Sequence, residues 1–443
     1  MRRRTLLWRL RTLRRQVHPD PQEMAGALNA ATMQLGISLS SPDLVLPILV
    51  RALGGSNVLI GTLPALRWSL VWLPQFLVSG WLQERRRRLP FYQVMELARM
   101  LSYAFLGILV VLLLPGRATL FLWIFFALFA ASRVVAGAGS LALTDVFGRI
   151  VRHEGRVRFF AIRSFAGALG SLLAGGLVSL AFRAASGSTS TYGLLFGASA
   201  LAFFGAVVAA QGLREPEAPA SLHHVRLVEQ CRRVPRLLRT PNFGRFLAVR
   251  VLVAMVHIAD PFYIVYAVER LGAPPALTGL YMTGMTLASL TGTFVWPHLD
   301  TLWGRERTLR LTLLASTLGP LLALGLGGMA TLLPSAKGVV PYLFALVFMT
   351  NGFGEFGRGI SFSAYMLDVS PPEDRPTYLG FMNSVLGIAA LAPMFGGWLV
   401  DHLGYGWLFC LALGLLGTGT LLSLRLGSVD AGVPEACPEE PQP

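Results

Sequence analysis

The chain has 443 residues, of which 54% are hydrophobic and only 14% are charged, and its net charge is +15. Because soluble domains carry roughly 25% charged residues, this composition excludes an ordinary water-soluble globular protein. The positive charge falls in short arginine clusters between long apolar stretches, which is typical of membrane topology signals and argues against a nucleic-acid-binding protein.

The apolar stretches are long enough to cross a bilayer as helices. A hydrocarbon core about 30 Å thick requires ~20 helical residues, and stretches of that length recur along the whole chain. They are uniformly apolar rather than alternating, which favours helices over the strands of a membrane barrel. We predict an all-α membrane protein with twelve transmembrane helices, at approximately residues 26–50, 57–82, 91–114, 119–147, 159–183, 193–212, 246–269, 276–299, 309–333, 339–366, 377–400 and 405–424.

The distribution of arginine predicts the orientation of these helices. Every second connection is basic, so we expect both termini in the cytoplasm and the protein in a bacterial-type inner membrane. The basic segments are the N-terminus and residues 83–90, 148–158, 213–245 and 300–310. The opposite side holds only isolated charges, namely Arg51, Arg117, Arg183, Arg270 and Lys337.

The polar segments divide the chain into five parts. Residues 1–25 form a basic cytoplasmic segment without the apolar core of a cleaved signal peptide. Residues 26–212 and 246–424 each form a six-helix bundle, and residues 213–245 form a cytoplasmic linker with an amphipathic surface helix. Residues 425–443 are rich in proline and glutamate and are expected to form a disordered cytoplasmic tail.

Segments of the two bundles correspond at an offset of about 218 residues, which indicates an internal repeat. Val50-Arg-Ala-Leu-Gly54 resembles Val268-Glu-Arg-Leu-Gly272, and Tyr192-Gly-Leu-Leu-Phe196 resembles Tyr405-Gly-Trp-Leu-Phe409. Further matches in the same order are Asp145 with Asp368, Arg156 with Arg375, and Gly175-Gly176 with Gly396-Gly397. We therefore predict two pseudo-twofold-related bundles that alternate access to a site at their interface near the membrane midplane.

Two motifs make the chain similar to the major facilitator superfamily over essentially its whole length. The connection Gly80-Trp-Leu-Gln-Glu84-Arg85-Arg-Arg-Arg88 is similar to that family's Gly-x-Leu-x-Asp-Arg-x-Gly-Arg-Arg loop, although Arg87 stands where the second glycine is expected. Arg133-Val-Val-Ala-Gly137-Ala-Gly139 resembles its Arg-x-x-Gln-Gly-x-Gly motif, with Ala136 in place of the glutamine. The resemblance implies the major facilitator fold and secondary transport.

The resemblance also implies a cytoplasmic gate built from charge pairs that break when the inner side opens. Its expected members are Gly80, Glu84, Arg85, Asp145, Arg163, Asp368 and Arg375. The alternative is that these arginines are solvated topology signals without a gating role.

Two carboxylates are expected near the middle of the membrane. Asp43 lies ten residues before Leu53 at the outer end of the first span, and Asp260 lies at nearly the equivalent place in the seventh, so both are ~15 Å deep. A carboxylate there can load and release a proton as access alternates, and Arg133 is the central cation expected to pair with it or with a substrate anion. The alternative is a permanent ion pair with Arg67, Arg133 or a helix terminus.

Other polar and aromatic side chains are candidates for lining a substrate cavity, and they are Arg67, Trp68, Trp72, Tyr263, Tyr266, Glu355 and Arg358. The aromatic residues suit an amphiphilic substrate, but they are also ordinary packing residues. The glycines around Glu355 and Arg358 suggest a moving gate. Glu96 and Arg99 share a helix face and are interpreted as an internal ion pair. His257 is interpreted as a packing histidine that could also titrate near neutrality.

These features favour a proton-coupled secondary transporter that exports amphiphilic small molecules by alternating access. The alternatives are a lipid or glycolipid flippase and a non-transporting membrane assembly factor on the same scaffold. An enzyme is not expected, because HExxH, GxSxG, CxxC and P-loop patterns are missing from the sequence. We expect no cofactor and no metal, and the expected partners are a small-molecule substrate, H⁺ and the lipid bilayer, with the oligomeric state left open.

Overall fold

The computed structural model describes residues 20–83, 85–114, 116–151, 156–184, 190–216, 241–370 and 375–426. All regular structure among these residues is helical, which confirms the predicted all-α fold. Most of the N-terminal basic segment, the linker with its expected surface helix and the C-terminal tail lie outside the described residues. The division into five parts therefore stays a prediction.

The helices follow the predicted spans in chain order. In the described part of the first half they are α2 (Pro21–Leu39), α3 (Leu46–Ala52), α4 (Asn57–Gln83), α5 (Leu89–Leu113), α6 (Ala118–Ile150), α7 (Arg156–Ala184) and α8 (Ser190–Ala210). In the second half they are α10 (Pro241–Met255), η2 (Val256–Ala259), α11 (Asp260–Glu269), α12 (Leu277–Trp303), α13 (Arg305–Leu332), η3 (Pro334–Ala336), α14 (Val340–Leu343), α15 (Ala345–Val369), α16 (Arg375–Ala389), α17 (Ala392–Leu403) and α18 (Tyr405–Ser423). Each predicted span coincides with one helix or with consecutive helices.

Eight helical stretches of the described chain are long and apolar enough to cross a membrane by length and composition. They are Leu89–Leu113, Ala118–Ile150, Arg158–Ala184, Ser190–Ala210, Asn242–Glu269, Arg305–Leu332, Tyr378–Leu403 and Tyr405–Ser423. Large apolar side chains such as Leu201 and Leu180 are exposed on these helices, where a membrane would supply lipid contacts. The architecture is therefore that of a multi-pass membrane protein.

Local signals in the sequence explain where several helices begin and end. Asp20 and Glu23 form a capping box at the start of α2. The Glu23 side chain accepts a hydrogen bond from the backbone N–H of Asp20, and the Asp20 side chain accepts one from the backbone of the first helical turn. Gly54 follows α3 with φ of +77°, and Gly272 follows α11 with φ of +69°. These two glycines occupy equivalent places in the predicted repeat, and only glycine adopts such a left-handed conformation without strain.

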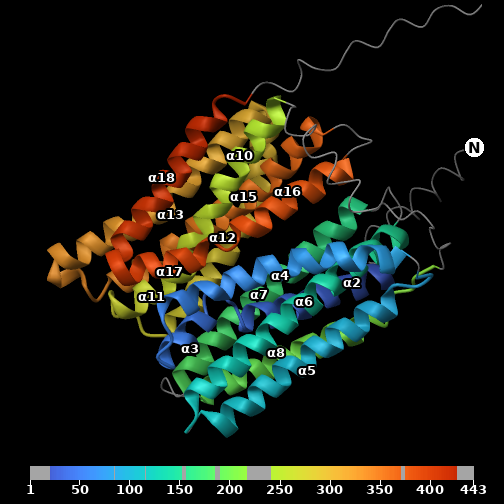
Figure 1. Ribbon diagram of the computed structural model, residues 1–443, viewed down its shortest axis with the longest axis horizontal. Helices are drawn as coiled ribbons and strands as arrows, with labels where there is room; N and C mark the ends of the chain where they lie inside the picture. The colour runs from blue at the N-terminus through green and yellow to red at the C-terminus, as the bar shows by residue number, and fades with distance from the viewer. Residues whose placement is uncertain are drawn as a thin grey trace, which may run out of the picture.

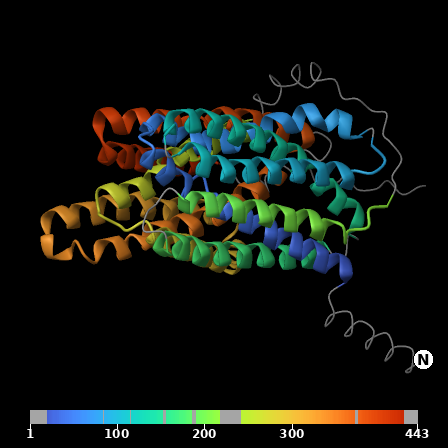
Figure 2. The same ribbon diagram turned by 90° about the horizontal axis from the view of Figure 1, so that it is seen from below.

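The helices form two bundles that lie side by side. Figure 1 shows the first half in blue to green and the second half in yellow to red, and Figure 2 shows that the helices of both run roughly along the long axis. Within the first half, α2 packs on α7 and α8, and α5 packs on α6 and α8. Within the second half, α15 packs on α12 and α13, and α18 packs on α10 and α13. The bundles meet mainly through α4 with α17 and α7 with α12.

The two ends of the molecule differ in how the halves are joined. At the end where α3 and α11 lie, one hydrophobic cluster crosses between the halves and includes Leu46 of α3 and Phe262 of α11. At the other end, the buried residues among those described form one cluster in each half, around Phe147 in the first and Phe243 in the second, and Trp72 of α4 packs from the first half onto the second cluster. We call the first of these the closed end and the second the open end.

Glycine permits close contact between the halves toward the closed end. A Cβ atom at Gly61 of α4 would overlap the carbonyl oxygen of Pro393 in α17. A Cβ atom at Gly175 of α7 would overlap Thr283 of α12, and one at Gly279 of α12 would overlap the carbonyl oxygen of Gly175. Small residues let membrane helices approach at backbone distance, so these contacts bring the bundles together at this end.

Candidate functional site

Two helix breaks lie at equivalent places in the two halves. In the first half, α2 ends at Leu39 and α3 begins at Leu46, and Pro42 and Asp43 lie between them. In the second half, the 3₁₀ segment η2 separates α10 from α11, which begins at Asp260. Proline and irregular backbone at membrane depth are tolerated where the freed polar groups face protein or a hydrated cavity. Both predicted midplane carboxylates therefore lie on broken helices.

Each of these carboxylates has a partner from its own half. Asp43 forms an ion pair with Arg67 of α4, and their side chains are 24% and 26% exposed. Asp260 lies 2.6 Å from Nδ1 of His257, and these side chains are 33% and 27% exposed. Charged groups in a membrane are costly unless they face protein or water, so each carboxylate is stabilised by the partner it contacts. Asp43 thus pairs with Arg67, whereas the sequence had favoured Arg133.

A third helix adds two charges to this region. Glu355 and Arg358 of α15 lie within electrostatic range of His257. Glu355 also lies within electrostatic range of Asp43 in the first half. Arg358 is buried and donates a hydrogen bond to Ser316 of α13. Arg67, Asp43, His257, Asp260, Glu355 and Arg358 are together called the central charged site below. Both halves contribute to it, as expected for a site at the interface of two repeats.

Arg133 lies inside the first bundle rather than at this interface. Its guanidinium donates a hydrogen bond of 2.9 Å to the hydroxyl of Tyr103 and lies 5.1 Å from the ring centre of Phe129. Among the described residues it has no carboxylate within ion-pair distance. Glu96 and Arg99 lie nearby as a buried pair 3.4 Å apart, in agreement with their interpretation as an internal ion pair.

The aromatic candidates divide into core and boundary residues. Tyr263 is buried and stacks on Phe409 at 5.0 Å, so it packs α11 against α18. Tyr266 contacts the same ring at 5.3 Å. Trp68 and Trp72 of α4 lie 5.5 Å apart, and the Arg67 guanidinium lies 4.7 Å from the Trp68 ring centre. The tryptophan pair adjoins the central charged site through Arg67, and Tyr263 lies within electrostatic range of Asp260 and Arg358.

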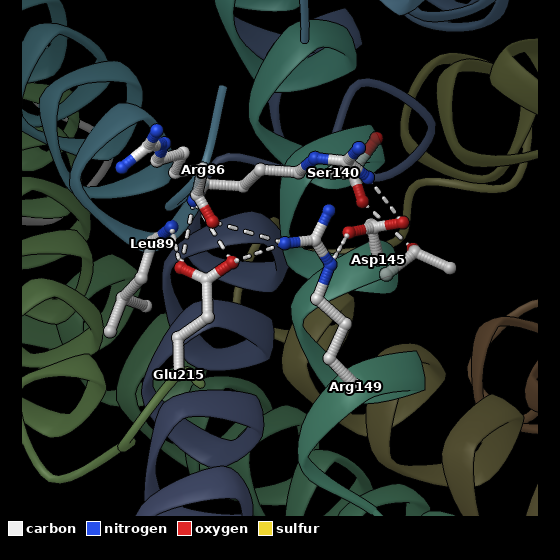
Figure 3. A network of polar contacts seen from close by, with 8 residues as sticks. Arg86, Leu89, Ser140, Asp145, Arg149 and Glu215 are labelled. Atoms are coloured by element: carbon white, nitrogen blue, oxygen red, sulfur yellow. Dashed lines mark hydrogen bonds and ion pairs between the residues drawn. The ribbon is translucent and has the colours of Figure 1, made fainter. Parts of the chain in front are cut away.

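The open end carries a charge network within the first half, which Figure 3 shows. Asp145 of α6 pairs with Arg88 and, at 2.7 Å, with Arg149. Glu215 accepts backbone hydrogen bonds of 2.7 Å from Arg88 and 2.8 Å from Leu89, and Arg149 lies 3.4 Å away. Glu215 thereby caps the N-terminus of α5 and fixes the start of the linker to the loop motif. No motif or charge pattern in the sequence pointed to this role for Glu215.

The predicted cytoplasmic gate residues are only partly described. Asp145 pairs with arginines of the first half and Asp368 pairs with Arg305 of the second, so the described pairs stay within a half. Arg163 lies over Phe147 at 4.1 Å, and Arg85 is exposed between α4 and α5. Glu84 lies outside the described residues. Gly80 and Arg375 belong to helices, but the surroundings of Gly80 and the side chain of Arg375 are not described.

At the closed end, polar side chains cross between the halves. Arg51 of α3 lies 2.5 Å from Glu269 of α11 and donates a hydrogen bond to Asn57 of α4. Asn57 in turn donates to Asp401 of α17 at 2.5 Å, and Tyr405 of α18 donates to Glu269 at 2.7 Å. These five residues are called the closed-end network. The charge distribution along the sequence predicts Arg51 to be an isolated charge, although it stands opposite Glu269 in the repeat.

Comparison with known proteins agrees with this architecture. Residues 254–442 match the sequence model of the Major Facilitator Superfamily. A probable efflux pump of Penicillium aethiopicum is 36% identical over 90 residues, which cover 20% of this chain and only 16% of that relative. The family match bears out the resemblance for the second half of the chain.

Solved transporter structures share the fold over nearly the whole chain. A D-xylose–proton symporter has a TM-score of 0.70 at 16% identity and covers 93% of this chain and 99% of its own. A bacterial homologue of the iron transporter ferroportin, in an inward-facing state, has a TM-score of 0.63 at 15% identity, with coverages of 91% and 98%. A nucleoside transporter has a TM-score of 0.65 at 15% identity, with the same coverages. At these identities the likeness shows the fold alone.

Proposed function

We propose that this protein is a proton-coupled secondary transporter that exports amphiphilic small molecules. It has the fold of Major Facilitator Superfamily transporters, and its second half matches that superfamily's model. The single observation that carries this proposal is the central charged site. Its two partly buried carboxylates, Asp43 and Asp260, lie on equivalent helix breaks, one in each half.

The chemistry of this site suits a proton carrier. Asp43 pairs with Arg67, and Asp260 pairs with His257. A proton that binds Asp43 would displace Arg67, whereas a proton can pass between Asp260 and His257. Rearrangement of the two halves alters the surroundings of both carboxylates, because Asp43 also interacts electrostatically with Asp260 and Glu355 across the interface. A change in these surroundings changes proton affinity, which couples protonation to the conformation of the bundles.

The orientation is part of the proposal. The arginine distribution favours cytoplasmic termini in a bacterial-type inner membrane. On that orientation the closed end faces outward and the open end faces the cytoplasm, so the conformer described here receives substrate from inside the cell. The tryptophan pair beside Arg67 supplies apolar area next to a charged group, which suits amphiphilic rather than fully polar substrates.

The test is proton flux in inverted vesicles that carry a proton gradient and a pH-sensitive dye. Tetraphenylphosphonium, ethidium and chloramphenicol are added in turn to vesicles with the wild type, Asp43→Asn, Asp260→Asn or Asp300→Asn. Asp300 lies near the open end of α12 outside the central charged site and serves as the matched control. We expect gradient dissipation with the wild type and the control, and its loss in the other two variants.

Either of two results contradicts the proposal. Dissipation by no compound with the wild type removes the support for proton-coupled export. Dissipation that persists in Asp43→Asn and Asp260→Asn shows that the proton is carried elsewhere. Equal amounts of each variant in the vesicle membrane, and a single symmetric peak for each in gel filtration, separate these outcomes from misfolding.

A further inference from the structure

Arg250 of α10 is an intramembrane cation for which the described residues supply no counter-ion. Its side chain is only partly exposed, and its Nε atom is buried without a hydrogen-bond partner. Its guanidinium lies 4.5 Å from the ring centre of Phe362 on α15. A ring face offsets only part of the cost of holding a cation at membrane depth. Arg250 therefore lacks the anionic group that would balance its charge.

The charge nearest to Arg250 is also positive. Among the described side chains, only Arg358 of α15 is a charged group within electrostatic range of it. Arg358 is 8% exposed, donates a hydrogen bond to Ser316, and has Glu355 and Asp260 within electrostatic range. Like charges repel more strongly away from bulk water. The two guanidinium groups thus concentrate positive charge where α10 meets α15, and only Arg358 has carboxylates to offset it.

This positive region lies between the central charged site and the open end, beside the first half. Arg250 precedes His257 by seven residues, which is two helical turns on the same face and ~10 Å toward the open end. Phe362 follows Arg358 by one turn of α15. Trp72 of α4 packs from the first half onto the hydrophobic cluster that contains Phe362. The two cations therefore have an aromatic surface next to them.

We propose that Arg250 and Arg358 bind the anionic head group of an amphiphilic organic anion, whose apolar body lies against Trp72 and Phe362. This proposal deepens the proposed transport function and rests on it, because it names the chemical class of the substrate. A guanidinium donates two parallel hydrogen bonds to a carboxylate or sulfonate, and the free Nε of Arg250 is one such donor. The bound anion supplies the counter-charge that Arg250 lacks.

The test is equilibrium binding, measured by isothermal titration calorimetry in phosphatidylcholine nanodiscs without any gradient. The probes share one ring system and differ in their head groups, and they are 2-naphthoate, naphthalene-2-sulfonate, 2-naphthylmethanol and 2-naphthylmethylammonium. We expect the wild type to bind the two anions at least about 10-fold more tightly than the alcohol or the ammonium compound, because a hydrogen bond to a charged group is worth that factor or more.

The variants ask whether Arg250 provides this selectivity. Arg250→Gln should weaken the binding of both anions at least about 10-fold and leave the binding of the alcohol unchanged. Arg250→Lys keeps the charge without the planar fork, so its affinity for the anions should lie between those of the wild type and Arg250→Gln. Arg245→Gln is the matched control on α10 and should change nothing, because the exposed Arg245 donates to the backbone of Arg425 instead.

Thermal unfolding separates an anion site from a structural arginine. Without ligand, Arg250→Gln should not lower the transition temperature, because it removes a buried charge that has no counter-ion. Naphthalene-2-sulfonate should raise the transition temperature of the wild type and of Arg245→Gln, and should not raise that of Arg250→Gln. A single symmetric gel-filtration peak for each variant shows that it is folded.

Equal affinity of the wild type for the anions and the alcohol overturns the proposal. So does an anion affinity that Arg250→Gln leaves unchanged. A third contrary result is displacement of naphthalene-2-sulfonate when phosphatidylglycerol is included in the nanodiscs, since the site would then hold a lipid head group.

The anion site and proton-coupled export can fail separately. Naphthalene-2-sulfonate, which stays ionised and does not carry protons across the bilayer by itself, is added to the dye assay in inverted vesicles. If it binds through Arg250 but no compound dissipates the proton gradient, the anion site stands and proton-coupled export does not. If only cationic or neutral compounds dissipate the gradient, and do so equally in Arg250→Gln, proton-coupled export stands and the anion site does not.

Discussion

Glu215 is a buried carboxylate that joins the start of the linker to two elements of the first half, and its replacement by alanine should destabilise the protein. Its side chain is 2% exposed and accepts hydrogen bonds from the backbone of Arg88 and Leu89, with Arg149 beside it. Loss of a helix cap costs about 0.5–2 kcal/mol, and a hydrogen bond to a charged group contributes about 1.5–3 kcal/mol. Because such contributions are not additive, we expect a total loss of ~2–4 kcal/mol.

The assay is thermal unfolding in detergent, followed by intrinsic tryptophan fluorescence. A loss of this size should lower the transition temperature by about 5–10 °C, treating each half as a domain of roughly 200 residues. Glu215→Gln keeps an acceptor oxygen but loses the charge, so its transition should lie between those of the wild type and Glu215→Ala.

Glu306 provides the matched control. It pairs with Arg310 one helical turn away at 3.6 Å, and both side chains are 27% exposed. Such a pair contributes less than about 1 kcal/mol, so Glu306→Ala should lower the transition by less than about 3 °C. If Glu215→Ala and Glu306→Ala shift the transition equally, the proposed role of Glu215 in fixing the linker is wrong.

Two further predictions concern packing. Gly61→Ala should push α4 away from α17, because its Cβ would overlap the Pro393 carbonyl, and it should lower the thermal transition temperature. Gly148→Ala, which has no atom within 4 Å of its Cβ, should leave that temperature unchanged. Tyr263→Ala should remove a buried ring and cost about 3–5 kcal/mol, whereas Tyr263→Phe should keep the stack on Phe409 and cost less than half as much; equal thermal shifts for the two Tyr263 variants would contradict the packing role.

Much of the fold could be predicted from the sequence because hydropathy and arginine placement are local properties of the chain. The length of each apolar stretch predicted the helices one by one, including the span that the Pro42 region divides into α2 and α3. The repeat predicted equivalent places for Gly54 and Gly272, and both adopt positive φ. Helical rise alone predicted a midplane depth for Asp43 and Asp260, and that depth stays a prediction.

The partners of the charged residues were less predictable. Arg67 and Arg133 both lie at a depth that suited Asp43, but only Arg67 projects from α4 toward it, while Arg133 turns to Tyr103 inside the first bundle. Sequence spacing fixes a residue's height along its helix, whereas the rotation of that helix about its axis depends on packing against its neighbours.

The sequence by itself determined that this protein is a helical membrane protein with two related halves, and it predicted similar places for Asp43 and Asp260 in those halves. The tertiary structure alone decided which residues meet across the halves, such as Arg51 with Glu269 and Asn57 with Asp401. The physical reason is that hydropathy and periodicity act along the chain. Contacts between residues more than two hundred positions apart depend instead on how the faces of the assembled bundles fit together.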